Sequence, residues 1–99
     1  MNKLELQIKS KALEDMENIA DFIAKDNRVA ARNLLNDLYF AFDKLCSFPQ
    51  MGFVRKDFTY LDVRFIKIRQ NYLIVYNFDN KSVNILRVLS NYQDICNLL

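Results

Sequence analysis

Three apolar runs follow one another between residues 61 and 89, and this stretch constrains the fold more than any other part of the sequence. Each run is rich in β-branched and aromatic residues, and the connections, residues 69–71 and 79–81, are short and polar. Runs with such short connections are typical of antiparallel strands joined by tight hairpins. We therefore predict a three-stranded antiparallel meander in this half of the chain.

The first run does not keep its apolar side chains on one face. Val63 and Phe65 share one side of an extended strand, whereas Ile66 and Ile68 share the other. A β-bulge near Phe65 and Ile66 would account for this pattern, and so would burial of the strand on both faces.

The second run, residues 72–78, is apolar at nearly every position, as expected for a central strand covered on both faces. Its Tyr72 and Tyr76 share a face, and we interpret them as core aromatics with the hydroxyl at the rim. The third run, residues 83–89, repeats the apolar pattern but contains Arg87. An arginine within so apolar a run requires a specific partner.

The residues before the meander predict one strand and two helices. Apolar and polar residues alternate over residues 3–9, as in a strand with one face in water. Ser10 can cap the helix that follows, whose apolar residues recur at spacings of three and four. This helix should end near residues 25–27, where Asp26 or Asn27 can cap the next one.

The second helix is predicted over residues 28–47, and Pro49 and Gly52 end it. Two amphipathic helices joined by a short turn form an antiparallel hairpin, and the sheet is the apolar surface available to both. The predicted fold class is α+β with the order β-α-α-β-β-β, in which an N-terminal strand joins the meander and the two-helix hairpin packs on one face. Residues 1–99 are expected to form a single domain.

The composition argues against several classes of function. No apolar run approaches the roughly 20 residues that span a bilayer, and the first residues lack a signal peptide's apolar stretch, so we expect a cytoplasmic protein. The sequence has no histidine, the commonest general base near neutral pH and the commonest metal ligand. Cys46 and Cys96 are isolated and favour buried side chains over a disulfide or metal site. We expect neither a metal nor any other cofactor.

The net charge of +2 is too small to predict nucleic-acid binding. Residues 53–99 carry most of the excess, with seven Lys or Arg against four Asp or Glu. This half would suit an acidic partner or a phosphate backbone, and a solvated surface explains its charge equally well.

A series of residues in a fixed order runs along nearly the whole chain. Around the two helices they are Ile8, Ala12, Ile19, Ile23, Ala31, Leu45, Phe48, Pro49 and Gly52. In the sheet they are residues 63–64, 72–76 and 83–89, followed by Asp94. In their joint order and spacing these positions resemble the RelE/ParE superfamily of bacterial type II toxins, and more closely its ParE-like branch.

The resemblance implies an antitoxin protein as partner and a role in plasmid stabilization, and it leaves two activities open. RelE-like relatives cleave messenger RNA on the ribosome with basic residues and a general acid or base on the sheet. ParE-like relatives bind and inhibit DNA gyrase without hydrolytic chemistry. A third hypothesis is a non-toxic relative that only binds its antitoxin.

The RelE-like pattern fits this sequence poorly. The arginine expected before the Leu-Val-Tyr of the central strand falls on Leu73, and the basic residue expected after the last strand falls near Asn91. RNA cleavage needs groups that hold the scissile phosphate and transfer protons, so losing two cations removes much of the charge stabilisation.

The ParE-like pattern fits better and is our preferred interpretation, with no catalytic residue assigned. It departs from that branch at Ser90 and Gln93, where His and Arg are often found. The positions that suit it are Tyr76, Arg64, Arg87 and Asp94.

Four residues are candidates for binding the target or the partner. For Arg64 and Arg87 the alternative is an intramolecular pair with Asp62 or Asp94, or a side chain that only reaches solvent. A solvated charge at a hairpin end is the alternative for Arg69, and core packing is the alternative for Tyr92. The four are Arg64, Arg69, Arg87 and Tyr92.

Overall fold

The structure is a computed structural model, and it describes residues 3–54, 56 and 62–90. The predicted order of elements is confirmed. The elements are β1 (Glu5–Ile8), α1 (Ser10–Ala24), α2 (Arg28–Ser47), the short 3-10 helix η1 (Pro49–Met51), β2 (Arg64–Ile68), β3 (Tyr72–Phe78) and β4 (Ser82–Ser90). The fold class is therefore α+β, as expected.

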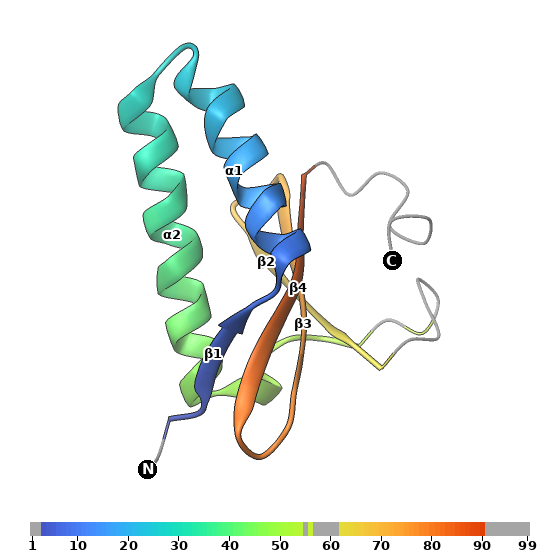
Figure 1. The fold of residues 1–99 in the computed structure, drawn as a ribbon. Coiled ribbons are helices and arrows are strands. Elements are labelled where there is room, and N and C mark those ends of the chain that lie inside the picture. The colour runs from blue at the N-terminus through green and yellow to red at the C-terminus, as the bar shows by residue number, and fades with distance from the viewer. Residues whose placement is uncertain (1–2, 55, 57–61, 91–99) are drawn as a thin grey trace.

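The four strands form one mixed sheet in the order β1-β4-β3-β2. Strands β2, β3 and β4 are the predicted antiparallel meander, because β2 pairs with β3 and β3 with β4 in antiparallel register. Strand β1 pairs with β4 in parallel, and the α1–α2 hairpin follows β1 and precedes the meander in the chain. Strand β2 lies at one edge of the sheet and β1 at the other (Figure 1).

The helices α1 and α2 lie side by side on one side of the sheet, and their connecting turn extends beyond the end of the strands (Figure 1). Helix α2 has the predicted bounds, and the Asn27 side chain caps it by accepting a hydrogen bond of 3.0 Å from the backbone N–H of Ala30. The predicted cap of α1 is wrong, because Ser10 is the first helical residue and Lys9 takes the cap position without a side-chain bond. Within the described part of the chain, neither helix is both long and apolar enough to cross a membrane.

Apolar side chains are buried on both faces of the sheet. The larger cluster lies between the sheet and the helices and includes Leu38, Phe42 and Ile74, while a second cluster on the other face includes Phe65 and Val75. The pattern in residues 63–68 is thus explained by burial on both faces. The alternative explanation, a bulge near Phe65 and Ile66, does not apply, because β2 pairs with β3 in unbroken register.

The irregularity of the sheet lies one strand further on, between β3 and β4. Val75 pairs with Arg87 and Tyr76 with Ile85, so β4 has one extra residue, Leu86, at this point. Such a bulge reverses the alternation of faces along a strand. As a result both Ile85 and Val88 lie in the large cluster with the helices, although they are three residues apart.

Candidate functional site

Arg87 of β4 forms a bidentate ion pair with Asp15 of α1. Its Nε donates to Oδ2 of Asp15 at 2.7 Å and its Nη2 donates to Oδ1 at 2.9 Å. Both side chains are largely buried, at 15% and 12% exposure. The hydrogen bond to Asp15 raises the pKa of Arg87 above its ordinary value, so the guanidinium is a permanent charge at this position. The sequence made Arg87 a candidate for binding a target or partner, with an intramolecular pair as the alternative. Asp15 was not among the residues suggested for that pair, and the suggested Asp94 lies outside the described residues.

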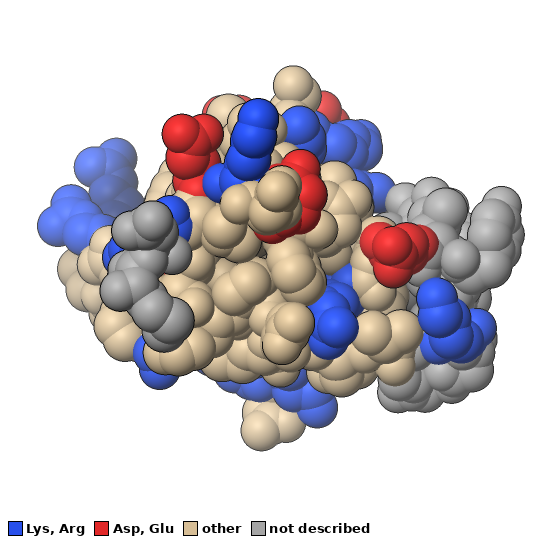
Figure 2. Space-filling model, turned by 90° about the horizontal axis from the view of Figure 1, so that it is seen from below, with Lys and Arg blue, Asp and Glu red and all other residues tan. Residues whose placement is uncertain are grey.

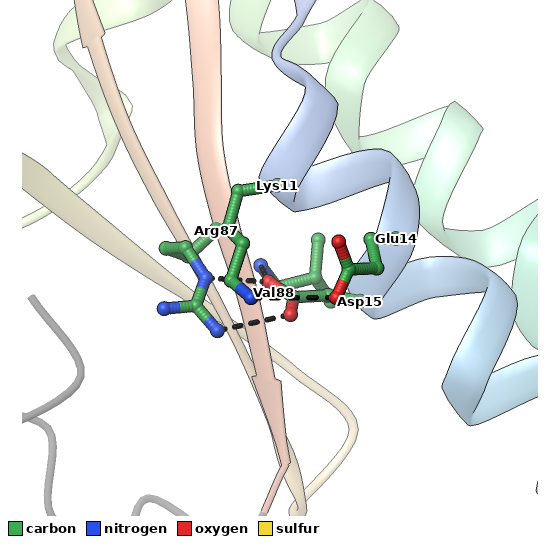
Figure 3. A network of polar contacts seen from close by, with 5 residues as sticks. All are labelled: Lys11, Glu14, Asp15, Arg87 and Val88. Atoms are coloured by element: carbon green, nitrogen blue, oxygen red, sulfur yellow. Dashed lines mark hydrogen bonds and ion pairs between the residues drawn. The ribbon is translucent and has the colours of Figure 1, made fainter.

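Asp15 also binds the backbone of β4. Strand β1 ends at Ile8, which pairs with Ile85, so none of the described strands neighbours β4 on that side from Leu86 onward. There the Asp15 carboxylate accepts a hydrogen bond of 3.0 Å from the backbone N–H of Val88. Figure 3 shows the carboxylate between the helix and the strand, with Arg87 and Val88 converging on it. Asp15 therefore fixes the first half of α1 to the sheet.

Arg64 at the start of β2 binds backbone carbonyls. Its Nη1 donates to the carbonyl oxygen of Gly52 at 2.9 Å and to that of Gln50 at 3.3 Å. The guanidinium carbon lies 5.7 Å from the centre of the Phe78 ring, within the range of a cation–π contact. The pair with Asp62, one alternative for Arg64, is not formed. Through its two carbonyl contacts Arg64 holds the segment after α2 against the sheet.

Arg69 lies in the β2–β3 hairpin with a φ of 55°, which is uncommon for a residue with a side chain. Its Nη2 lies 2.6 Å from Oδ2 of Asp37 in α2, and both side chains are about half exposed. The candidate cation is therefore at the surface and already paired. This pair joins the hairpin to the helical layer.

Tyr76 differs from its prediction, because its hydroxyl is not at the rim. The side chain is fully buried, its hydroxyl accepts a hydrogen bond from the backbone N–H of Gly52, and it donates one to the carbonyl of Pro49, both at 2.8 Å. Burial raises the pKa of the Tyr76 phenol above its ordinary value. A neutral phenol that makes two buried hydrogen bonds has a structural role.

The candidate residues do not come together in one site. Arg64 and Arg69 lie at opposite ends of β2, Arg87 lies in β4, and Tyr92 is outside the described residues. On the face shown in Figure 2, Lys and Arg side chains are scattered around a largely uncharged centre. No group of acidic or cysteine side chains in the described residues could hold a metal ion.

A groove lies between α2 and β2 on the surface of the described residues. It has a volume of about 330 Å³. Phe40 and Met51 are exposed to 64% and 45%, although both are large apolar residues. The Lys44 Nζ lies 5.0 Å from the centre of the Phe40 ring. The groove is lined by Asp37, Phe40, Ala41, Lys44, Met51, Ile66, Ile68 and Arg69.

Sequence reasoning identified Arg69 but not the apolar residues of this groove. A signal was present: residues 38–42 of α2 are apolar at five consecutive positions, and one helix face cannot bury them all. Leu38, Ala41 and Phe42 are buried, so the excess, Tyr39 and Phe40, is exposed. Exposed aromatic residues next to a groove are typical of a binding surface.

Comparison with solved structures first defines the class of fold. The chain is similar to one in a structure titled "Chromosomal ParDE TA system from P. aeruginosa", with a TM-score of 0.72 and 19% sequence identity over 89% of this chain and 96% of that one. At this identity the likeness shows the fold, a two-helix hairpin on a mixed sheet. Comparison with curated proteins gives no match.

The family follows from the sequence itself. Residues 6–95 match the model of the family described as "ParE toxin of type II toxin-antitoxin system, parDE". The chain belongs to the ParE toxin family of type II toxin–antitoxin systems. The resemblance to the RelE/ParE superfamily is thereby confirmed.

Proposed function

We propose that this chain acts by binding and inhibiting DNA gyrase and that a cognate antitoxin neutralises it. Membership of the ParE toxin family supports a toxin with an antitoxin partner. Beyond this, we propose that the target is gyrase and hence that the protein acts in the cytoplasm.

The observation that carries this proposal is the separation of the arginines. A ribonuclease must gather cations around one phosphate and place a proton-transfer group beside them. In the described part of the chain, Arg64 binds carbonyls, Arg69 pairs with Asp37 and Arg87 pairs with Asp15. These three cations maintain the fold at three separate places, which favours inhibition by binding over RNA cleavage.

The proposal is tested by adding the purified protein, in parallel, to a gyrase supercoiling reaction and to ribosomes translating a defined message. We expect supercoiling to be lost and cleaved DNA to accumulate on gyrase, with the message intact. Cuts in the message at defined codon positions, with gyrase unaffected, would contradict the proposal and favour a ribosome-dependent nuclease. No effect in either reaction, together with tight antitoxin binding, would identify a non-toxic relative.

A further inference from the structure

We propose that the outer edge of β1 pairs in antiparallel fashion with the same edge of a second copy of this chain, with Gln7 on the twofold axis, so that the two four-stranded sheets join into one. The inference concerns the chain by itself, so it goes beyond the action on gyrase and does not depend on it. It is carried by the open backbone of β1, the length of the open stretch and the order of its side chains.

The backbone of β1 is bonded to a neighbouring strand on one side only. The N–H groups of Glu5 and Lys9 donate to carbonyl oxygens in and just before β4, at 2.9 and 3.0 Å, so these residues face β4. Backbone groups alternate in direction along a strand, so the N–H and C=O groups of Leu6 and Ile8 point to the opposite side. None of the described strands lies there (Figure 1).

The open stretch of the edge has two defined ends. Before it, the Leu4 N–H donates to the Cys46 carbonyl of α2 at 3.0 Å, and after it α1 begins at Ser10. Three of the four residues of β1 are exposed and the fourth is half-buried, so the helices do not cover the strand. The open stretch is therefore residues 5–9, and its centre is Gln7. Antiparallel pairing about Gln7 matches the open stretches of two copies over their full length.

This register also matches the backbone hydrogen-bonding groups. It places Leu6 of each copy opposite Ile8 of the other, and both residues direct their N–H and C=O groups outward. Each such pair of residues exchanges two N–H···O bonds, as in an antiparallel ladder. A shift of one residue would set an outward-facing residue against an inward-facing one and lose these bonds.

The side chains of the stretch complement their own reverse order. On each side of the axis Glu5 lies opposite Lys9, and Leu6, which is 39% exposed, lies opposite Ile8. Glu5 has no ion-pair partner among the described residues, and the Lys9 ammonium donates to Oε1 of Gln7 at 3.2 Å. Opposite charges and apolar pairs across an antiparallel ladder stabilise it. Charge and apolar contacts thus both select a second copy of this chain.

The other edge of the sheet does not offer an equivalent surface. In β2, Phe65 exchanges two backbone hydrogen bonds of 2.8 Å with Phe53, so part of that edge is already paired. The net charge of +2 is small, so two copies repel each other only weakly. Because the β1 stretch is shorter than a standard interface, we expect weak association, with a Kd between about 1 µM and 1 mM.

Sedimentation equilibrium of the full chain over a range of concentrations tests the association, and Leu6→Pro tests the edge. Proline removes the outward N–H of Leu6 but no hydrogen bond to β4, and edge strands tolerate it at such positions. We expect a reversible monomer–dimer equilibrium for the natural protein and dimerisation at least about thirtyfold weaker for Leu6→Pro. A natural circular dichroism spectrum verifies that the variant is folded.

Charge reversal tests the register and does not depend on proline. Glu5→Lys and Lys9→Glu each set like charges opposite one another, so each should weaken self-association about tenfold. An equal mixture of the two variants should recover the natural association, because two lysines of one chain then face two glutamates of the other. The matched control is Lys25→Glu, which makes the same charge change as Lys9→Glu at the exposed end of α1 and should associate like the natural protein.

Amide hydrogen exchange measured by NMR locates the contact. As the concentration rises, exchange of the Leu6 and Ile8 amides should slow, whereas the Gln7 amide, which faces β4, should keep its rate. A protein that stays monomeric up to about 1 mM would overturn the inference. So would a dimer that Leu6→Pro leaves intact, or a mixture of the charge variants that fails to recover association. Neither gyrase nor an antitoxin enters these measurements, so their failure would leave the proposed function standing.

Discussion

Asp15 and Arg87 lie 72 residues apart in the sequence, and their side chains are joined by two hydrogen bonds of 2.7 and 2.9 Å. Bidentate pairs between a carboxylate and a guanidinium are among the stronger polar contacts in proteins. Because Asp15 also accepts the N–H of Val88, the pair occupies the side of β4 on which none of the described strands lies beyond Ile85. Arg87, one of the four candidates for binding a target or partner, is thus part of the scaffold.

Replacing Arg87 by alanine should destabilise the protein. The substitution leaves the Asp15 carboxylate largely buried without its guanidinium, and we expect the free energy of unfolding to fall by about 2–4 kcal/mol. Denaturant unfolding followed by circular dichroism measures this loss.

The matched control is Arg69→Ala, which also removes one arginine from an ion pair. Its pair with Asp37 is about half exposed, so the loss should be only about 0–1 kcal/mol. If Arg87→Ala kept the natural stability but lost activity, Arg87 would be a binding residue and the structural assignment would be wrong.

Asp15→Asn and Asp15→Ala should differ in their effect on the β4 backbone. The asparagine keeps an oxygen that can accept the Val88 N–H, whereas alanine leaves that N–H without its side-chain acceptor. Hydrogen exchange of the Val88 amide, measured by NMR, should be slow in the natural protein and in Asp15→Asn, and at least about tenfold faster in Asp15→Ala. Equal exchange rates in the three proteins would show that the carboxylate does not protect the strand.

Tyr76→Phe should cost about 1–3 kcal/mol, because the Gly52 N–H and the Pro49 carbonyl lose their buried partner. The pH dependence has a defined sign. The pKa of Tyr76 is higher in the folded protein than its ordinary value of 10.0, so the stability from the neutral phenol is present below that value. It is lost as the pH rises through the folded-state pKa.

Urea unfolding at a series of alkaline pH values checks this prediction. The difference in stability between the natural protein and Tyr76→Phe should be constant up to about pH 10 and shrink above it. A difference that grew with pH would mean that the phenolate, and not the phenol, is the stabilising form.

Gly52→Ala should destabilise the protein through steric clashes and not through backbone conformation. A Cβ at Gly52 would lie 2.7 Å from Cε1 of Tyr76 and 2.8 Å from the backbone oxygen of Phe65, both closer than real contacts. We expect a loss of about 1–3 kcal/mol. The loss should be smaller in the Tyr76→Phe background, because the hydroxyl that also crowds this position is absent there. Simple additivity of the two substitutions would contradict this packing.

Local sequence signals predicted the elements well where a specific residue marks a boundary. The bounds of α2 were correct, because Asn27 caps its start and Pro49 begins the next element. Ser10 was misjudged because the backbone N–H of Lys9 still bonds to the Ile85 carbonyl of the sheet at 3.0 Å. The chain is therefore extended at Lys9, and α1 starts at Ser10, one residue earlier than it would with Ser10 as its cap.

The site was harder to predict, because its contacts join residues far apart in the chain. The pair of Arg87 with Asp15 and the contact of Tyr76 with Gly52 depend on how α1 and η1 pack on the sheet, and no local pattern specifies either. The excess of apolar residues in α2 indicated that an apolar side chain such as Phe40 would be exposed. Its position beside Met51 and Ile66 could not be predicted without knowing the fold.

The most direct test of the account measures the DNA that gyrase holds cleaved as the purified protein is titrated into the reaction. We predict that linear DNA accumulates as the protein approaches equimolar amounts with gyrase, and that an equimolar amount of antitoxin added first prevents it. Arg69→Ala should behave like the natural protein if Arg69 only joins the hairpin to α2. Undiminished supercoiling with no linear DNA, from a folded protein that binds its antitoxin, would contradict the account.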